Sequence, residues 1–439
     1  MLKKIIYIAL LPALVASMSG CKKGYLDINQ SNPNQTDNPP IGALLSYVTS
    51  ETGLNVYRAG YFTSYYMQYL ASSTISSGSD TYDDVDRSSI WQTVYNVITD
   101  SRVMIGVAEK ANGYHHIGVA KLAEAMNMSL LIDLFGDVPY SEAWDKSNFK
   151  PTYDNAQDVY NACLTLIDAA LTEFNKPDPG VALDAANDLI HGGNVNAWKK
   201  TANALKARLL NRVSKTAGYN SASILAALGG AYTSNADDAQ LNSFVARSPW
   251  NQVAYNNTVL LLDGWLSQQY VDALDGTTYG YTDPRLPLVA TLTQFGDYRG
   301  TPNGAGRVGT GTDDEESYLS VDGFYSKAGA PLQLITYAEM KFIESEAKFA
   351  TDKPGSYQAY LDGIAAHMDK LGVSPGAKAT YLSNPDVAVG SGAFTKAHLF
   401  KEKYIAMFLH PGPMLAGTIT TIRTSVYLLT RYSIHLSAG

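Results

Sequence analysis

The 439-residue sequence contains only two cysteines, Cys21 and Cys163. Cys21 directly follows an apolar N-terminal stretch, whereas Cys163 lies in the apolar-periodic stretch 159–171 and is expected to be a small buried hydrophobe. If Cys21 carries a lipid, no intramolecular disulfide is available to the rest of the chain. The fold is then expected to form without one.

Two further features are missing. After residue 20 no apolar run of about 18 residues without charge occurs, so no membrane-spanning helix is expected in that part of the chain. The chain also lacks an excess of positive charge, because 33 Lys and Arg residues stand against 41 Asp and Glu residues and give a net charge of −8 at pH 7. This balance argues against a nucleic-acid partner and fits neutral or uncharged ligands better.

Hydrolase motifs are absent as well, because neither H-E-x-x-H nor G-x-S-x-G occurs. Residues 304–309 match G-x-G-x-x-G, but they stand in an expected loop without the strand and helix that a dinucleotide site requires. Glu339 and Glu346 are seven positions apart on one expected helix, and paired carboxylates can cleave glycosides. We expect them instead to form ion pairs with a neighbouring helix, for example with Lys206 or Arg208. No catalytic residue and no cofactor are therefore assigned.

A histidine pair and two acidic clusters raise the question of a metal site. His115 and His116 are adjacent and therefore point apart, so joint ligation is not expected. The acidic run 313–316 lacks the alternating ligands and the glycine turn of a calcium hand, which favours a solvated loop and leaves a calcium ion open. The same interpretation holds for the second cluster, which consists of Asp80, Asp83, Asp84 and Asp86. No metal ligand is assigned.

The N-terminus has the layout of an export signal. Two lysines precede the apolar stretch 5–15, which is too short to span a bilayer, and small residues precede Cys21. The last residues before Cys21 resemble a bacterial lipobox, although Met18 stands where Leu is usual. An ordinary secretory cut near Ala16 or Gly20 is the alternative. Acylation of Cys21 would anchor the protein to a membrane without letting it cross.

Beyond the signal, residues 24–40 are rich in Asn, Pro and Asp, which predicts a tether. Apolar residues that recur every three or four positions predict helices over 91–108, 118–135, 196–215, 334–350 and 394–409. Between about 216 and 330 the helical pattern thins, and loops of this length are usually functional or disordered. Successive amphipathic helices with short joins indicate hairpins stacked in the manner of tetratricopeptide units.

Four stretches resemble the SusD/RagB family. They are the segment 118–143, whose helix ends in FGDVPY, the segment 187–215 with its WKK motif, DPRL at 283–286, and LITYAEMKFIESEAKFA at 334–350. With the lipobox and the LDIN and NPN pieces of the tether, the resemblance extends from about residue 21 to 410. It implies an all-α fold of tetratricopeptide-like hairpins, whose long irregular loops form the ligand side. It also implies a lipoprotein of the outer membrane in Bacteroidetes-type bacteria that serves a SusC-like TonB-dependent transporter barrel.

The resulting domain expectation has four parts: a signal peptide at 1–20, an acylated tether at 21–40, a SusD-like helical domain at 41–410 and an atypical tail at 411–439. Two departures from the family pattern matter. Lys22 and Lys23 follow Cys21 where surface-exported lipoproteins of the family usually have acidic residues, so the leaflet stays open. After Pro411 the expected acidic residue, Trp, Asp and paired Arg are missing, and we hypothesise a frameshift or truncation there.

Candidate ligand-binding residues come from the aromatic content, which includes 30 tyrosines. A sugar site requires flat aromatic faces flanked by hydrogen-bonding side chains, and loops supply such faces better than helix stripes do. The candidates are Tyr82, Trp250, Tyr279, Tyr281, Tyr318 and Tyr325, whereas Trp91, Trp144 and Trp198 are assigned to packing. The expected function is weak capture of an oligosaccharide, or of a peptide, for import. A non-transport adhesion or scaffold lipoprotein and a secreted hydrolase are the alternatives.

Overall fold

The computed structural model describes residues 39–83, 85–145, 147–177, 180–259, 264–308 and 314–410. The expectations for Cys21, for the tether and for the tail after Pro411 fall outside these residues. The chain divides into one unit of residues 1–40 and a second of residues 41–439, and the elements below belong to the second.

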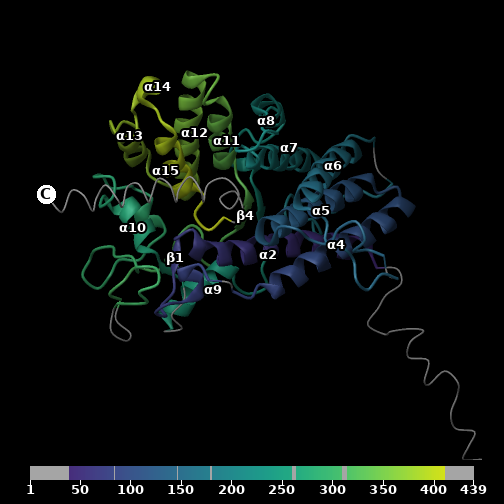
Figure 1. Ribbon diagram of the computed structural model, residues 1–439, viewed down its shortest axis with the longest axis horizontal. Helices are drawn as coiled ribbons and strands as arrows, with labels where there is room; N and C mark the ends of the chain where they lie inside the picture. The colour runs from purple at the N-terminus through teal and green to yellow at the C-terminus, as the bar shows by residue number, and fades with distance from the viewer. Residues whose placement is uncertain are drawn as a thin grey trace, which may run out of the picture. The chain divides into compact units, whose positions relative to one another are not determined.

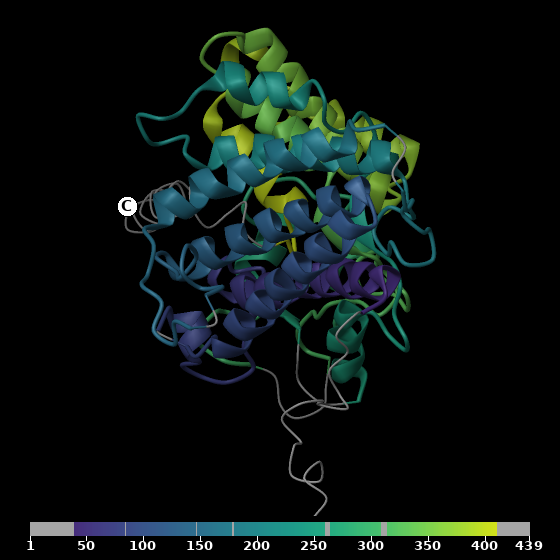
Figure 2. The ribbon, with the colours of Figure 1, turned by 90° about the vertical axis from the view of Figure 1, so that its right-hand side faces the viewer.

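The first half of this unit is built from long helices that pack on their neighbours in the chain. Helix α4 contacts α5, α5 contacts α6, and α6 contacts α7, while α2 packs against α4 and α5. Figure 2 shows the successive layers that result. The elements are α2 (Ile41–Tyr66), β1 (Leu70–Ala71), α3 (Gly78–Thr81), α4 (Ser88–Lys110), α5 (Tyr114–Phe135), α6 (Ala156–Phe174) and α7 (Val195–Arg212).

The second half consists mostly of shorter elements and lies beside the long helices (Figure 1), and its buried apolar residues belong to the same core. They are α8 (Ser221–Leu228), η2 (Asn235–Asp237), β2 (Ala239–Leu241), α9 (Pro249–Thr258), β3 (Trp265–Leu266), α10 (Gln268–Asp275), η3 (Leu286–Leu288), β4 (Leu332–Ile335), α11 (Tyr337–Lys348), α12 (Lys353–Leu371), α13 (Pro375–Leu382), α14 (Gly390–Ala393) and α15 (Lys396–Ala406). Strand β1 pairs antiparallel with β3, and β2 pairs antiparallel with β4. In the described part of the chain these two-stranded sheets are the only ones, so the predicted all-α class is confirmed.

The five predicted helices are all present, and local signals set their ends. Helix α5 begins four residues earlier than predicted, at Tyr114, and ends as predicted at Phe135, where Gly136 follows with a positive φ of 76° that favours glycine. The prediction over 334–350 was wrong at its start, where residues 332–335 form the buried strand β4 and Thr336 caps the helix that follows. After residue 216 the helical pattern in the sequence is weak, and the three helices α8, α9 and α10 in that region were not predicted.

Glycine permits a close contact between α5 and α6. A Cβ atom at Gly118 would lie 2.5 Å from the ring of Phe174, so any larger residue would push the two helices apart. Phe174 is 1% exposed and belongs to the apolar core. Cys163 of α6 is buried in the same core at 1% exposed, as predicted for a small hydrophobe, and burial raises the pKa of its thiol to about 12.

Buried ion pairs join α7 and α15 to α11. The Arg208 guanidinium contacts the Glu339 carboxylate twice, at 2.6 Å from Nε and at 2.5 Å from Nη2, and Glu339 is fully buried. Glu346 pairs with Lys403 at 2.5 Å. The predicted ion pairing of both carboxylates is therefore confirmed, with Arg208 and not Lys206 as the partner of Glu339, because Lys206 pairs with Asp168 on α6.

Among the described residues, no helix is both long enough and apolar enough to cross a bilayer.

Candidate ligand-binding pocket

A pocket of about 390 Å³ opens between the end of α2, helix α10, the loop after α10, and α15. Its walls carry Tyr279 and Tyr281 from the loop, together with His398, Lys401 and Tyr404 from α15. Gln68, Gln269 and Asp386 add polar groups to the same lining. Two of the six aromatic residues selected from the sequence therefore share one cavity.

The loop 276–283 presents the two tyrosines because it folds back onto α10. Gly276 ends α10 with φ 103°, and Gly280 has φ 76°, both in the left-handed region that favours glycine. The backbone N–H of Gly280 donates to the carbonyl of Gly276 at 2.8 Å, and Asp283 N–H donates to the Leu274 carbonyl at 2.7 Å. The backbone is thus pinned on both sides of Tyr281.

The ammonium group of Lys401 lies between the rings. Its Nζ atom is 4.4 Å from the ring centroids of both Tyr279 and Tyr281. It donates to the hydroxyl of Tyr281, to the hydroxyl of Tyr381 at 3.3 Å and to Glu402 Oε1 at 3.0 Å. Burial alone would lower the pKa of Lys401, but Glu402 and Tyr281 outweigh it, so the pKa is raised and the ammonium stays charged.

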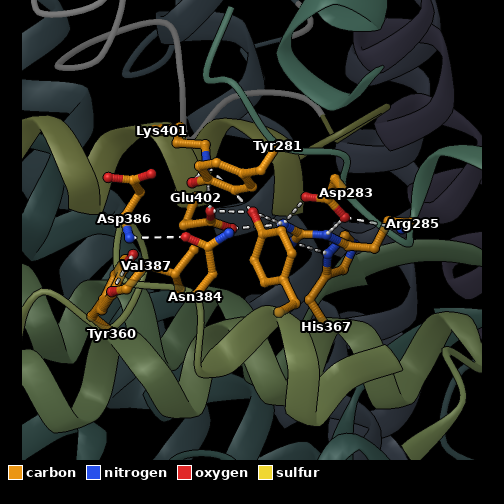
Figure 3. A network of polar contacts seen from close by, with 11 residues as sticks. Tyr281, Asp283, Arg285, Tyr360, His367, Asn384, Asp386, Val387, Lys401 and Glu402 are labelled. Carbon is orange, nitrogen blue, oxygen red and sulfur yellow. Dashed lines mark hydrogen bonds and ion pairs between the residues drawn. The ribbon is translucent and has the colours of Figure 1, made fainter. Parts of the chain in front are cut away.

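A network of buried charges lies behind this wall. Glu402 accepts from Arg285 at 2.6 Å and from the Tyr381 hydroxyl at 2.7 Å, while Arg285 also pairs with Asp283 at 2.5 Å. Figure 3 shows Lys401, Tyr281 and Glu402 converging, with Asp283 and Arg285 beside them. The positive charges of Arg285 and Lys401 are balanced by the negative charges of Asp283 and Glu402. Asp283 and Arg285 are the first and third residues of the DPRL motif noted in the sequence, which gives this motif a structural role.

The protonation state of His367 follows from its neighbours in the network (Figure 3). Arg285 Nη1 lies 3.2 Å from Nδ1 of His367, and a guanidinium can only donate, so Nδ1 accepts. The proton therefore resides on Nε2, which donates to the hydroxyl of Tyr325 at 3.0 Å. Burial first, and then the charge of Arg285, lower the pKa of His367 well below its usual value, so the ring is neutral.

Tyr82 does not line this pocket and lies beside the end of α2, with its ring centroid 5.8 Å from that of Tyr66. It ends α3 in a left-handed conformation (φ 65°), with 41% of its surface exposed. Burial raises the pKa of the pocket residue Tyr404 well above its usual value, and Tyr279 and Tyr82 both add to the shift.

The other three aromatic candidates lie elsewhere. Trp250 is not in an irregular segment but on α9, and it is 3% exposed, with its ring centroid 4.9 Å from that of Tyr57. Tyr325 is also 3% exposed and bonded to His367. The expectation of an accessible ring is wrong for both, because the core covers them. Tyr318 is half-buried against Trp265, at 5.5 Å between centroids, and does not line the pocket.

Of the three tryptophans assigned to packing, one is buried as predicted and two are only partly buried. Trp198 is 2% exposed and donates from its indole N–H to Asp188 at 2.7 Å. Trp91 and Trp144 pack against the core but are only half-buried.

Sequence reasoning did not select Lys401, Tyr381 or His398. All three lie on helices, whereas the sequence analysis expects ligand-binding side chains in loops. The sequence offers only the segment KEKY at 401–404 as a signal, and it does not show that Glu402 is buried, at 0% exposed. A buried acidic residue beside a lysine on a helix indicates an ionic network, but the sequence does not show which loop supplies the partners.

The acidic clusters and the glycine pattern have structural roles in the described residues. Asp80 accepts from the backbone N–H groups of Ser72 at 2.9 Å and Gly304 at 3.2 Å, and so joins two loops. Gly306 (φ 72°) lets the chain approach Ile75, where a Cβ would lie 2.7 Å from backbone. Glu316 pairs with Arg307. Asp84, Gly309 and Asp313 lie outside the described residues, and in the described part no group of three or more His, Cys, Asp or Glu residues is arranged to hold a metal.

Comparisons with known families and with solved structures both identify SusD-like proteins. A family model described as "SusD-like_2: Starch-binding associating with outer membrane" matches residues 33–412. A SusD/RagB family protein from Bacteroides thetaiotaomicron superposes with a TM-score of 0.71 at 19% identity, covering 88% of each chain. A chitin-binding SusD homologue from Flavobacterium johnsoniae superposes with a TM-score of 0.68 at 19% identity, covering 86% of each chain. No curated protein matches the sequence.

Proposed function

Because the chain belongs to the SusD-like family of starch-binding proteins that associate with the outer membrane, we propose that it captures an oligosaccharide in the pocket around Tyr279 and Tyr281. The observation that supports this most directly is the pair of tyrosines held on either side of Lys401 in an open cavity. The family consists of binding proteins, and the two glutamates considered for glycoside cleavage are both held in ion pairs.

The pocket offers the groups that an uncharged sugar requires. Phenol rings provide apolar faces for the C–H side of a sugar ring, and amide and carboxylate groups bind its hydroxyls. Gln68, Gln269 and Asp386 supply such groups in the lining. Lys401 uses its three N–H donors on Tyr281, Tyr381 and Glu402. We therefore assign Lys401 the role of positioning Tyr281, with the ligand contacting the rings.

Replacing Tyr281 tests this assignment. We expect Tyr281→Ala to weaken retention of the full-length protein on immobilised starch or chitin at least ten-fold, because the stacking face and its hydrogen bond are both lost. Tyr281→Phe keeps the face and should lose less. The measurement is affinity electrophoresis in gels with and without each polysaccharide. Thermal unfolding of each variant identifies any loss that is caused by misfolding.

Tyr47→Ala is the control, because Tyr47 is an accessible tyrosine, 38% exposed, that does not line the pocket. It should leave retention unchanged. Equal retention by wild type, Tyr281→Ala and Tyr47→Ala would show that the pocket does not bind the glycan.

We further propose that the protein is anchored at the outer membrane through Cys21 and transfers its ligand to a SusC-like TonB-dependent barrel. The family description supports membrane association. Extraction of the native protein from outer membranes in mild detergent, followed by affinity purification, should recover such a barrel in stoichiometric amount by mass spectrometry. Cys21→Ser should release the protein from the membrane fraction. A purified protein without any barrel would contradict the transport role and favour a freestanding binder or scaffold.

A further inference from the structure

A second aromatic hollow lies at the start of α4, apart from the pocket. It is a shallow, open hollow of about 500 Å³, and it is lined by Trp91 of α4, Phe135 at the end of α5, Tyr153 and Arg87. The ring centroid of Trp91 is 5.1 Å from that of Phe135 and 6.1 Å from that of Tyr153. Tyr153 is 66% exposed, which is unusual for a large aromatic side chain and typical of a binding surface.

Polar groups border the rings of this hollow. Asp86 and Ser88 are exposed at its rim, and the Asp86 carboxylate accepts from the Ser88 N–H at 2.8 Å. Arg87 donates from Nη1 to the carbonyl of Leu134 at 3.4 Å, which fixes the guanidinium between α4 and α5. The hollow thus combines accessible aromatic faces with a carboxylate, a hydroxyl and a cation, which are the groups that recognise a hydroxylated ring.

A row of rings joins the hollow to the pocket. The Arg87 guanidinium lies 4.4 Å above the ring of Phe62 and 5.6 Å from that of Tyr66. The centroids of Phe62 and Tyr66 are 4.8 Å apart, and Tyr66 is followed by Tyr82 at 5.8 Å. Tyr66 is followed in the chain by Met67 and Gln68, which line the pocket and whose carbonyls accept from the Tyr404 hydroxyl at 3.1 and 2.9 Å. The half-buried rings of Phe62 and Tyr66 therefore lie between the hollow and the pocket, along the last turns of α2.

We propose that the hollow of Trp91 and Tyr153 is a second saccharide subsite, which binds the continuation of a chain whose other part occupies the pocket. The inference rests on the proposed function and adds the ligand class, an oligosaccharide of several rings and not a mono- or disaccharide. A protein partner fits less well, because a stable protein interface buries about 800 Å² on each side, whereas this hollow offers only the three rings of Trp91, Phe135 and Tyr153.

The experiment compares ligand lengths. Calorimetric titration of the wild-type protein with chitobiose and chitohexaose, and with maltose and maltoheptaose, should show tighter binding of the longer member of one pair. Tyr153→Ala should weaken binding of that longer sugar about three- to ten-fold and leave the disaccharide unchanged, because only the longer chain reaches the hollow. Trp91→Phe, which keeps most of the packing volume, should have the same direction of effect.

Two control variants separate this inference from the proposed function. Tyr281→Ala should weaken both lengths, and Tyr47→Ala neither. If the wild type binds both lengths and Tyr153→Ala binds the longer one as tightly as the wild type does, the second subsite is overturned while the pocket stands. If the wild type binds no sugar of either pair, the proposed function and the subsite fail together.

Discussion

Arg285→Met is expected to destabilise the protein by about 3–5 kcal/mol, which is the cost of leaving a buried charge without its partner. The side chain of Arg285 is 1% exposed, and its two carboxylate partners, Asp283 and Glu402, are 1% and 0% exposed. Methionine has nearly the length of the arginine stem, so the variant removes charge and hydrogen bonds but little packing volume. In this variant Glu402 keeps Lys401 and Tyr381, whereas Asp283 loses its ion pair.

The measurement is equilibrium unfolding in urea, followed by circular dichroism. Arg299→Met is the matched control, because Arg299 forms the same kind of pair with Asp297, at 2.7 Å, but both side chains are about half exposed. Its unfolding midpoint should be close to that of the wild type, since solvent screens exposed pairs. Equal midpoints for Arg285→Met and Arg299→Met would mean that burial does not set the importance of the pair.

The double change Arg285→Met with Asp283→Asn should recover only part of this loss, because Arg285 serves two carboxylates. Neutralising one of them leaves the other with fewer donors than before. This sharing distinguishes the network from a simple pair, in which neutralising both members can restore stability.

Arg208→Met is the second change with a large expected effect, again about 3–5 kcal/mol. It leaves Glu339 with no guanidinium at a position that is 0% exposed, and it removes the donor to the Leu334 carbonyl at 2.7 Å. At present the pKa of Glu339 is lowered, because Arg208 outweighs the burial that would raise it. Without Arg208, burial should raise the pKa of Glu339 above its usual value. The variant should therefore gain stability relative to the wild type as the pH falls, because protonation removes the buried charge of Glu339.

Two further variants complete this test by urea unfolding. Lys206→Met lies two residues away on the same helix and removes an ion pair with Asp168, which is 57% exposed, so little change is expected. Arg208→Met combined with Glu339→Gln should recover much of the loss, because no buried charge remains. If the double variant is as unstable as Arg208→Met alone, the cost comes from packing or from the Leu334 carbonyl and not from the unpaired carboxylate.

The elements that could be predicted from the sequence are those whose signals are local. Helix α5 has an apolar repeat and a glycine at its end, and both survive in the structure. Helix α9 has a local signal too, because Ser248 caps it and Pro249 occupies its first position. The residues around this signal are typical of turns and favour a loop, which is why the sequence analysis places Trp250 in one.

The pocket was predictable only in part. Tyr279 lies between Gly276 and Gly280, and Tyr281 directly follows Gly280, which indicates that both rings stand in a turn. The burial of Tyr325 depends on His367, 42 residues later, and the position of Tyr281 depends on Lys401, 120 residues later. Contacts over such separations are fixed by how the helices pack, and a single sequence carries no periodic pattern that reports them.

The attachment of Tyr281 to the core has a consequence for how a ligand associates. Lys401 connects the phenol to Glu402, and Glu402 connects it to Arg285, so the wall is ordered when the chain folds and not when a sugar arrives. The entropy of ordering this wall is therefore paid before the encounter, and a ligand has only its own freedom to lose. Free and occupied forms should share one backbone conformation here, with affinity limited by contact area and release correspondingly fast.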